Sequence, residues 1–248
     1  MTQPLLQDFD DRKRQVRHYL AVVMKAERTA RIGTATPAEN GRLLILRVGT
    51  FLVLYNLVEA TTRGAIEAIH DKITTQAVPF GSLTVTLRGE VIKRFKRGSG
   101  ADSEKLHTMV DFPSAFVAVT LAQGIDLSGN VDARVIRELG TCYGFSCVTE
   151  KSRTRDGSDL VTIKQNRNDL AHGRKTFEEV GRDHTSTELI LLSRRAMRYM
   201  GEIAMNVSSY LDNEDYLDNP IAQRSMVQVS DKKPTKPWWN CFIWGHRR

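Results

Sequence analysis

A long apolar stretch with helical periodicity constrains the fold of this chain more than any other feature. Between residues 42 and 75, apolar side chains recur every three or four positions on one wide face, while Asn56, Arg63, Glu67 and Lys72 lie on the opposite face. A helix of that length reaches on the order of 45 Å at about 1.5 Å per residue. Because such a helix needs partners along its whole length, the pattern predicts an all-α helical bundle built around it.

The most apolar part of this stretch, LLILRVGTFLVLYNLVEA, is a core helix by our interpretation rather than a membrane span. Arg47, Asn56 and Glu59 interrupt it within residues 43–60, and polar side chains are costly in the bilayer interior. The first residues of the chain, MTQPLLQDFDDRKRQ, lack the apolar segment of a secretory signal. We therefore expect a cytoplasmic protein without a transmembrane segment.

The same periodicity predicts further helices over residues 5–31, 103–123, 160–172 and 186–211. A shorter helix is expected to begin at Asp132 and to end near Gly140 or Gly144. In residues 77–100 apolar and polar side chains alternate in part, which indicates either a short hairpin insertion or a helix broken at Gly89. KSRTRDGSD, residues 151–159, is predicted to be a polar loop.

After about residue 214 no period is sustained, so the sequence predicts one domain over 1–213 and a basic, aromatic tail over 214–248. The tail ends in WWNCFIW between Lys236 and Arg247. These side chains suit base stacking and phosphate contacts, a protein partner or an anionic membrane. We favour the protein partner, because so many exposed aromatic side chains are a liability in a free monomer.

Charge favours a polyanionic partner. The chain carries a net charge of +7; residues 151–175 hold seven Lys or Arg against three Asp, and residues 224–248 hold six against one. The three cysteines, Cys142, Cys147 and Cys241, have neither an even count nor CxxC spacing. They argue against a disulfide framework or a structural zinc site, and the sequence predicts neither a metal nor a cofactor.

The run QNRNDLAHGRKTFEEVGR contains Arg167-Asn168-x-x-x-His172. On a regular helix Asn168 and His172 share a face, whereas Arg167 lies about 140° from His172 around the axis. One copy is therefore an awkward site. Two copies that face each other across a two-fold axis would supply the same residues from both chains.

These residue types suit cleavage of RNA. Histidine exchanges protons near neutral pH, and arginine binds phosphate and stabilises charge that develops on it. Attack by the neighbouring ribose 2′-hydroxyl requires no metal ion, and Asn168 could fix the imidazole or position the ribose. In the competing structural interpretation, Arg167 is a solvated charge and His172 is a residue favoured at a helix C-terminus.

RNDLAHG followed by FEEVGRD strongly resembles the motif of the HEPN superfamily, in its MAE-type subfamily of HEPN-like nucleases. LYNLVEATTRGAIEAI (54–69) and SGNVDARVIRELGTCYGF (128–145) are similar to that subfamily's other signature stretches. The resemblance covers about residues 10–211. It implies a HEPN-like helical bundle that dimerises and brings two Arg-x4–6-His motifs together for metal-independent RNA cleavage, often as a toxin or antiphage effector with an antitoxin or defence partner.

Carried over to this chain, the resemblance makes Arg167 and His172 catalytic, with Asn168 as the polar residue after the arginine. Lys164, Arg174 and Lys175 flank the motif and are predicted to bind RNA. The resulting hypothesis is a homodimeric endoribonuclease. The alternative is a HEPN scaffold that has lost cleavage and binds RNA or a partner subunit.

Other polar residues are predicted to be structural. Glu59 and Arg63, four apart on the long helix, either pair with each other or reach the catalytic groove, and we favour a structural ion pair. The five remaining histidines share no spacing: His18, His70, His107, His184 and His246. Of these, only His184 is close enough to the motif in sequence to support the site.

Overall fold

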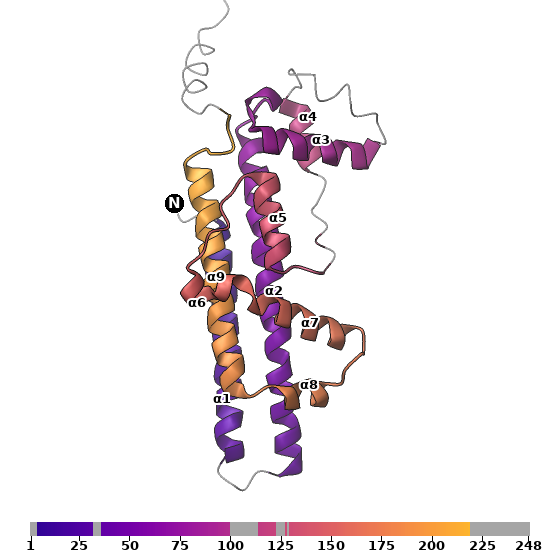
Figure 1. Cartoon of the computed structure of the whole chain (residues 1–248), viewed down its shortest axis with the longest axis vertical. Coiled ribbons are helices and arrows are strands. Elements are labelled where there is room, and N and C mark those ends of the chain that lie inside the picture. The colour runs from indigo at the N-terminus through magenta and orange to yellow at the C-terminus, as the bar shows by residue number, and fades with distance from the viewer. Residues whose placement is uncertain (1–3, 32–35, 100–113, 123–126, 128, 219–248) are drawn as a thin grey trace, which may run out of the picture.

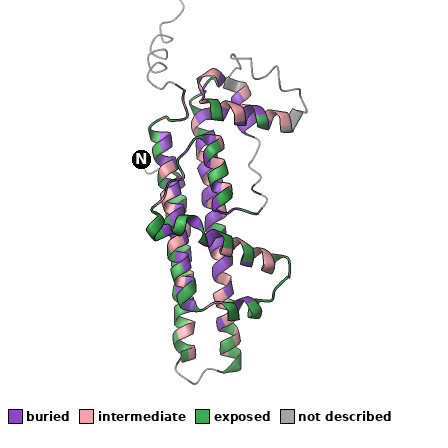
Figure 2. Cartoon of the chain, viewed as in Figure 1, coloured by how far each residue is buried: buried purple, intermediate pink, exposed green. Residues whose placement is uncertain are grey.

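Three long helices run side by side along the molecule: α1 (Pro4–Arg31), α2 (Pro37–Thr75) and α9 (Ser186–Asp212) (Figure 1). The computed structural model describes residues 4–31, 36–99, 114–122, 127 and 129–218. α2 is the spine, since it contacts α1, α4, α7, α8 and α9. Buried residues lie along the facing sides of these helices (Figure 2). The chain is therefore an all-α bundle, as the periodicity predicted.

Local sequence explains where α2 and α9 begin. Thr36 and Thr185 are N-caps whose side chains accept the backbone N–H three residues on, while Glu39 and Glu188 bond back to the cap N–H. This reciprocal box satisfies N–H groups that a helix start leaves without partners. By length and composition α2 is apolar enough to cross a membrane, a test that core helices of soluble proteins also pass.

Shorter helices pack around this frame: α3 (Val85–Ser99), α4 (Ser114–Leu121), α5 (Ala133–Tyr143), α6 (Lys151–Thr154), α7 (Asp159–Ala171) and α8 (Phe177–Asp183), with 3-10 turns η1 (Phe80–Ser82) and η2 (Arg155–Gly157). The helix predicted from Asp132 is confirmed, with Asp132 as its N-cap and Gly144 as its C-cap. Of the helix predicted over 103–123, residues 103–113 and 123 lie outside the described part, and the rest contains α4.

The hairpin predicted as one alternative for residues 77–100 is wrong, and so is a helix break at Gly89. α3 runs through Gly89, and within the described ranges the chain has no strand. The alternation was misleading because Glu90 and Arg94 are buried together with Leu87 and Val91 on one helical face. Glu90 accepts from Arg94 at 3.0 Å, so two opposite charges stabilise each other inside the bundle.

The polar loop predicted over 151–159 is also wrong, since α6, η2 and the start of α7 occupy it. Beyond α9 the packed structure continues: Tyr216 is fully buried, and Leu217 forms an isolated bridge with Leu83. The rest of the predicted tail, residues 219–248, lies outside the described residues, as do Cys241 and His246. Cys142 and Cys147 are free thiols.

Candidate active site

The motif lies on α7, which extends sideways from the bundle (Figure 1). At the start of α7, Asp159 accepts two hydrogen bonds from Arg195 of α9, at 2.5 and 3.1 Å. Leu160 and Ile163 are buried against the core one turn apart. This anchoring of the first half of α7 sets the position of its second half, which carries the motif and packs on the core through Leu170.

Arg167 is held against α2. Its guanidinium carbon lies 4.6 Å from the centre of the Tyr55 ring, within the range of a cation–π contact. Its Nη1 donates to Asn168 Oδ1 at 2.9 Å and to the Gly129 carbonyl at 3.4 Å. The arginine is half-buried, so these contacts fix the direction in which it presents its charge.

The turn before α5 completes this arrangement. Gly129 has a φ of +63°, and a Cβ at that position would lie 3.2 Å from Arg167 Nη1, so glycine suits both the backbone and the close approach. Asn130 Oδ1 accepts from Asn168 Nδ2 at 3.0 Å, and the Val131 N–H donates to the Tyr55 hydroxyl at 3.1 Å. Burial raises the pKa of Tyr55, which keeps its hydroxyl protonated.

His172 is placed differently. It is the C-cap of α7, its backbone N–H donates to Asn168 O at 3.0 Å, and its side chain is exposed. Within the described part of the chain no hydrogen bond joins its imidazole to Arg167 or Asn168. The structure thus brings Arg167 and Asn168 together and leaves His172 at the open end of the helix, so Asn168 orients the arginine rather than the imidazole.

The predicted RNA-binding residues fall into two classes. Lys164 pairs with Asp132, the N-cap of α5, and its side chain is largely covered. Arg174 and Lys175 are exposed beside His172, with the carboxylates of Asp169 and Asp183 at 3.7 and 3.3 Å respectively. Such exposed pairs are weak and easily exchanged for a phosphate.

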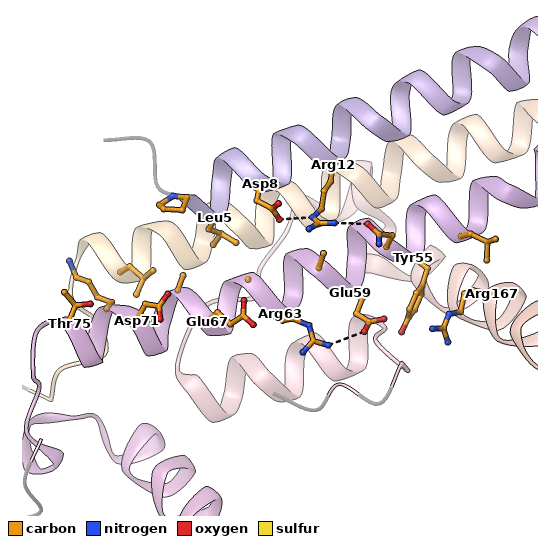
Figure 3. Close-up of a pocket in the computed structure, with 18 residues that line it drawn as sticks. Leu5, Asp8, Arg12, Tyr55, Glu59, Arg63, Glu67, Asp71, Thr75 and Arg167 are labelled. Atoms are coloured by element: carbon orange, nitrogen blue, oxygen red, sulfur yellow. Dashed lines mark hydrogen bonds and ion pairs between the residues drawn. The ribbon is translucent and has the colours of Figure 1, made fainter. Parts of the chain in front are cut away.

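Arg167 also borders a large groove along α2, with a volume of about 1380 Å³ (Figure 3). Glu59 and Arg63 form the predicted ion pair, 3.3 Å apart, on its wall. The lining charges balance, with four acidic and four basic residues: Asp8, Glu59, Glu67, Asp71, Arg12, Arg63, Lys72 and Arg167. A balanced groove is a poor track for a polyanion over its whole length.

His184 contacts the site indirectly. Its ring packs edge-on against Phe51, with centroids 5.0 Å apart, and lies 3.5 Å from Asn166 Nδ2. Burial lowers its pKa. Among the described residues, no group of three or more His, Cys, Asp or Glu side chains could hold a metal ion.

A family model described as HEPN_MAE_28990:/-like HEPN matches residues 1–216. The chain belongs to this HEPN family. The match confirms the resemblance found in the sequence and agrees with the all-α bundle. HEPN domains are generally associated with RNase activity, and they often dimerise and bind RNA. No curated protein and no solved structure matches the chain.

The motif alone did not identify the residues that hold Arg167. Tyr55, Gly129 and Asn130 were not singled out as site residues, although they lie in the two other stretches that carry the family resemblance. That coincidence is the signal by which they could have been found. In this HEPN protein, the three signature stretches meet at one guanidinium.

Proposed function

We propose that this HEPN protein is a metal-independent endoribonuclease whose site forms between two copies of the chain. The observation that carries the proposal is that the Arg167 guanidinium is fixed against α2 while His172 is exposed at the C-terminal end of α7. One chain offers a phosphate-binding group and a proton-transfer group that do not contact each other. A two-fold axis near the end of α7 would bring the His172 of one chain to the Arg167 of the other.

In this site the ribose 2′-oxygen attacks the adjacent phosphorus as one His172 imidazole accepts its proton. The bond from phosphorus to the 5′-oxygen breaks, and the same imidazole, now protonated, donates its proton to that oxygen. The products are a 2′,3′-cyclic phosphate and a 5′-hydroxyl end. Arg167 stabilises the charge that develops on the phosphoryl oxygens. Arg174 and Lys175 contact neighbouring phosphates, and Lys164 contributes after it leaves Asp132.

The direct test measures cleavage of a single-stranded RNA in EDTA by the purified chain. His172→Ala and Arg167→Ala each abolish cleavage, DNA of the same sequence stays intact, and the His18→Ala control, at an exposed α1 position, cleaves normally. An inert wild type would instead favour the non-catalytic scaffold. That candidate also has an observation behind it, since Arg167 already has partners within its own chain.

Mixing the two inactive variants tests the composite site. If each site takes its arginine and histidine from different chains, mixed dimers keep one intact site. About a quarter of the wild-type activity then returns, because half of the dimers are mixed and each keeps one site of two. A site contained in one chain would give no recovery.

We further propose a toxin or defence effector that acts in the cytoplasm, controlled by an antitoxin or defence-system partner. Induced expression of the wild type in a bacterial host should arrest growth, and His172→Ala should not. Equal growth of the two strains would count against the toxin role while leaving cleavage in vitro as a separate question.

A further inference from the structure

A second groove runs between α1, α6 and α9, with a volume of about 820 Å³. In Figure 1, α6 lies across α9 on one side of the bundle, whereas the motif end of α7 projects from the other side. Apolar side chains form part of the groove lining. Three of them are unusually exposed, namely Met24 at 38%, Leu191 at 46% and Met205 at 53%. The unbranched, flexible side chain of methionine adapts to varied apolar surfaces, and methionine is common at protein-binding sites.

Most of the charged residues that line this groove are basic. Six of its charged residues are basic and one, Glu202, is acidic; the six are Lys13, Arg17, Arg153, Arg194, Arg195 and Arg198. By contrast, the groove beside Arg167 has balanced charges. The two grooves therefore select different occupants.

Within the described part of the chain, two of the six basic residues have no ion-pair partner. The other four are paired with carboxylates: Lys13 with Asp10, Arg153 with Glu150, Arg195 with Asp159, and Arg198 with Glu150 and Glu202. Arg17 of α1 and Arg194 of α9 are exposed, and across the described ranges no carboxylate lies within ion-pair distance of either. Uncompensated charge on both walls of an apolar channel favours an occupant with acidic flanks and an apolar face.

We propose that this groove binds an acidic amphipathic helix of a partner protein. The helix would place its apolar face on Met24, Leu191 and Met205, and its carboxylates would pair with Arg17 and Arg194. Helix-in-groove recognition uses apolar anchors at i, i+3, i+4 and i+7 and charge at the edges. The proposal does not depend on the nuclease activity, because the groove contains neither Arg167 nor His172.

The composition of the groove disfavours three other occupants. None of the described residues that line it is aromatic, so these residues offer single-stranded RNA no stacking platform. A second copy docked symmetrically would oppose one basic rim to another. Residues 224–248 of the chain itself carry six Lys or Arg against one Asp, so their charge is also repelled.

The test uses the full chain and a fluorescein-labelled peptide of about 18 residues, with leucines at i, i+3, i+4 and i+7 and glutamates on both flanks. Binding is followed by fluorescence anisotropy. The control is a scrambled peptide of the same composition, which has the same net charge but no continuous apolar face. A 2′-O-methyl RNA, which lacks the attacking hydroxyl, reports RNA binding without cleavage.

We expect saturable binding of the amphipathic peptide, weakened about tenfold or more by Arg17→Glu with Arg194→Glu. Leu191→Ser with Met205→Ser, both at exposed positions, should weaken it to a similar degree. The matched control, Arg42→Glu with Arg134→Glu, changes the net charge equally at exposed sites outside the groove and should leave binding unchanged.

Three results would overturn the proposal. In the first, the scrambled peptide binds as well as the amphipathic one. In the second, the 2′-O-methyl RNA is the tighter ligand and loses affinity on charge reversal but not on the serine substitutions, which makes the groove an RNA surface. In the third, no peptide binds up to about 1 mM. None of these outcomes bears on cleavage by Arg167 and His172.

Discussion

His70 makes the stability of the fold depend on pH in a way that can be calculated. It lies on α2, is 7% exposed, and its Nε2 is 2.9 Å from the Tyr143 hydroxyl of α5. Arg94 of α3 donates to the same hydroxyl oxygen at 2.6 Å and pairs with Glu90. A neutral imidazole can accept the hydroxyl proton of Tyr143 through Nε2, whereas a protonated imidazole cannot. Burial first, and then the charge of Arg94, lower the pKa of His70 to about 3.

Because this pKa lies below the ordinary value of 6.5, the unfolded chain binds the proton before the folded one does. The contribution of His70 to stability is complete above about pH 6.5 and is lost as the pH falls towards 3. Each pH unit inside that window is worth about 1.4 kcal/mol. Between pH 7 and pH 5 the wild type should therefore lose about 2 kcal/mol of unfolding free energy through this residue.

Urea unfolding at pH 7 and pH 5 measures the loss. The difference between the two pH values should be about 2 kcal/mol smaller in His70→Gln than in the wild type. His18→Gln, an exposed change on α1, should keep the wild-type difference. If His70→Gln and the wild type lose the same free energy, the reasoning is refuted. If the variant does not fold, NMR titration of the His70 ring in the wild type tests the prediction instead. Protonation of that ring above pH 5 would likewise refute the reasoning.

Other predictions concern the contacts of the site and the backbone. Tyr55→Leu should lower RNA cleavage about tenfold, because Arg167 loses the ring that holds it. Tyr55→Phe keeps the ring and should retain most of the wild-type activity. Equal activity of the two variants would argue against the cation–π contact. Asp132→Ala removes the acceptor of two N–H groups at the start of α5 and should cost about 1–2 kcal/mol in urea unfolding. Gly157→Ala should cost more than about 2 kcal/mol, since φ is +74° and the new Cβ would lie 2.7 Å from a neighbouring side-chain carbon. Gly89→Ala, a helix position with open space, should instead stabilise the protein by up to about 1 kcal/mol; similar melting temperatures for the two alanine variants would contradict this pair.

The predicted helices that matched the structure share a property. In α1, α2 and α9 the buried side chains are mostly apolar and recur at helical spacing, so one face can be recognised without knowing what covers it. α3 failed this test because Glu90 and Arg94 lie on its buried face. Inside the bundle these two side chains are stabilised by their own ion pair and by the hydrogen bond from Arg94 to the Tyr143 hydroxyl. Tyr143 is distant in the sequence, so the residues around α3 do not reveal it as a partner.

The sequence by itself determined the helical class, the spine formed by α2 and the motif with Arg167, Asn168 and His172. These follow from residue type and from spacing within one helix, which the 3.6-residue period fixes locally. Only the tertiary structure decided that Arg167 rests on Tyr55 and the Gly129 carbonyl while His172 stays exposed at the end of α7. The physical reason is that a side chain's direction follows from its own helix, whereas its partner depends on how helices distant in the chain pack together.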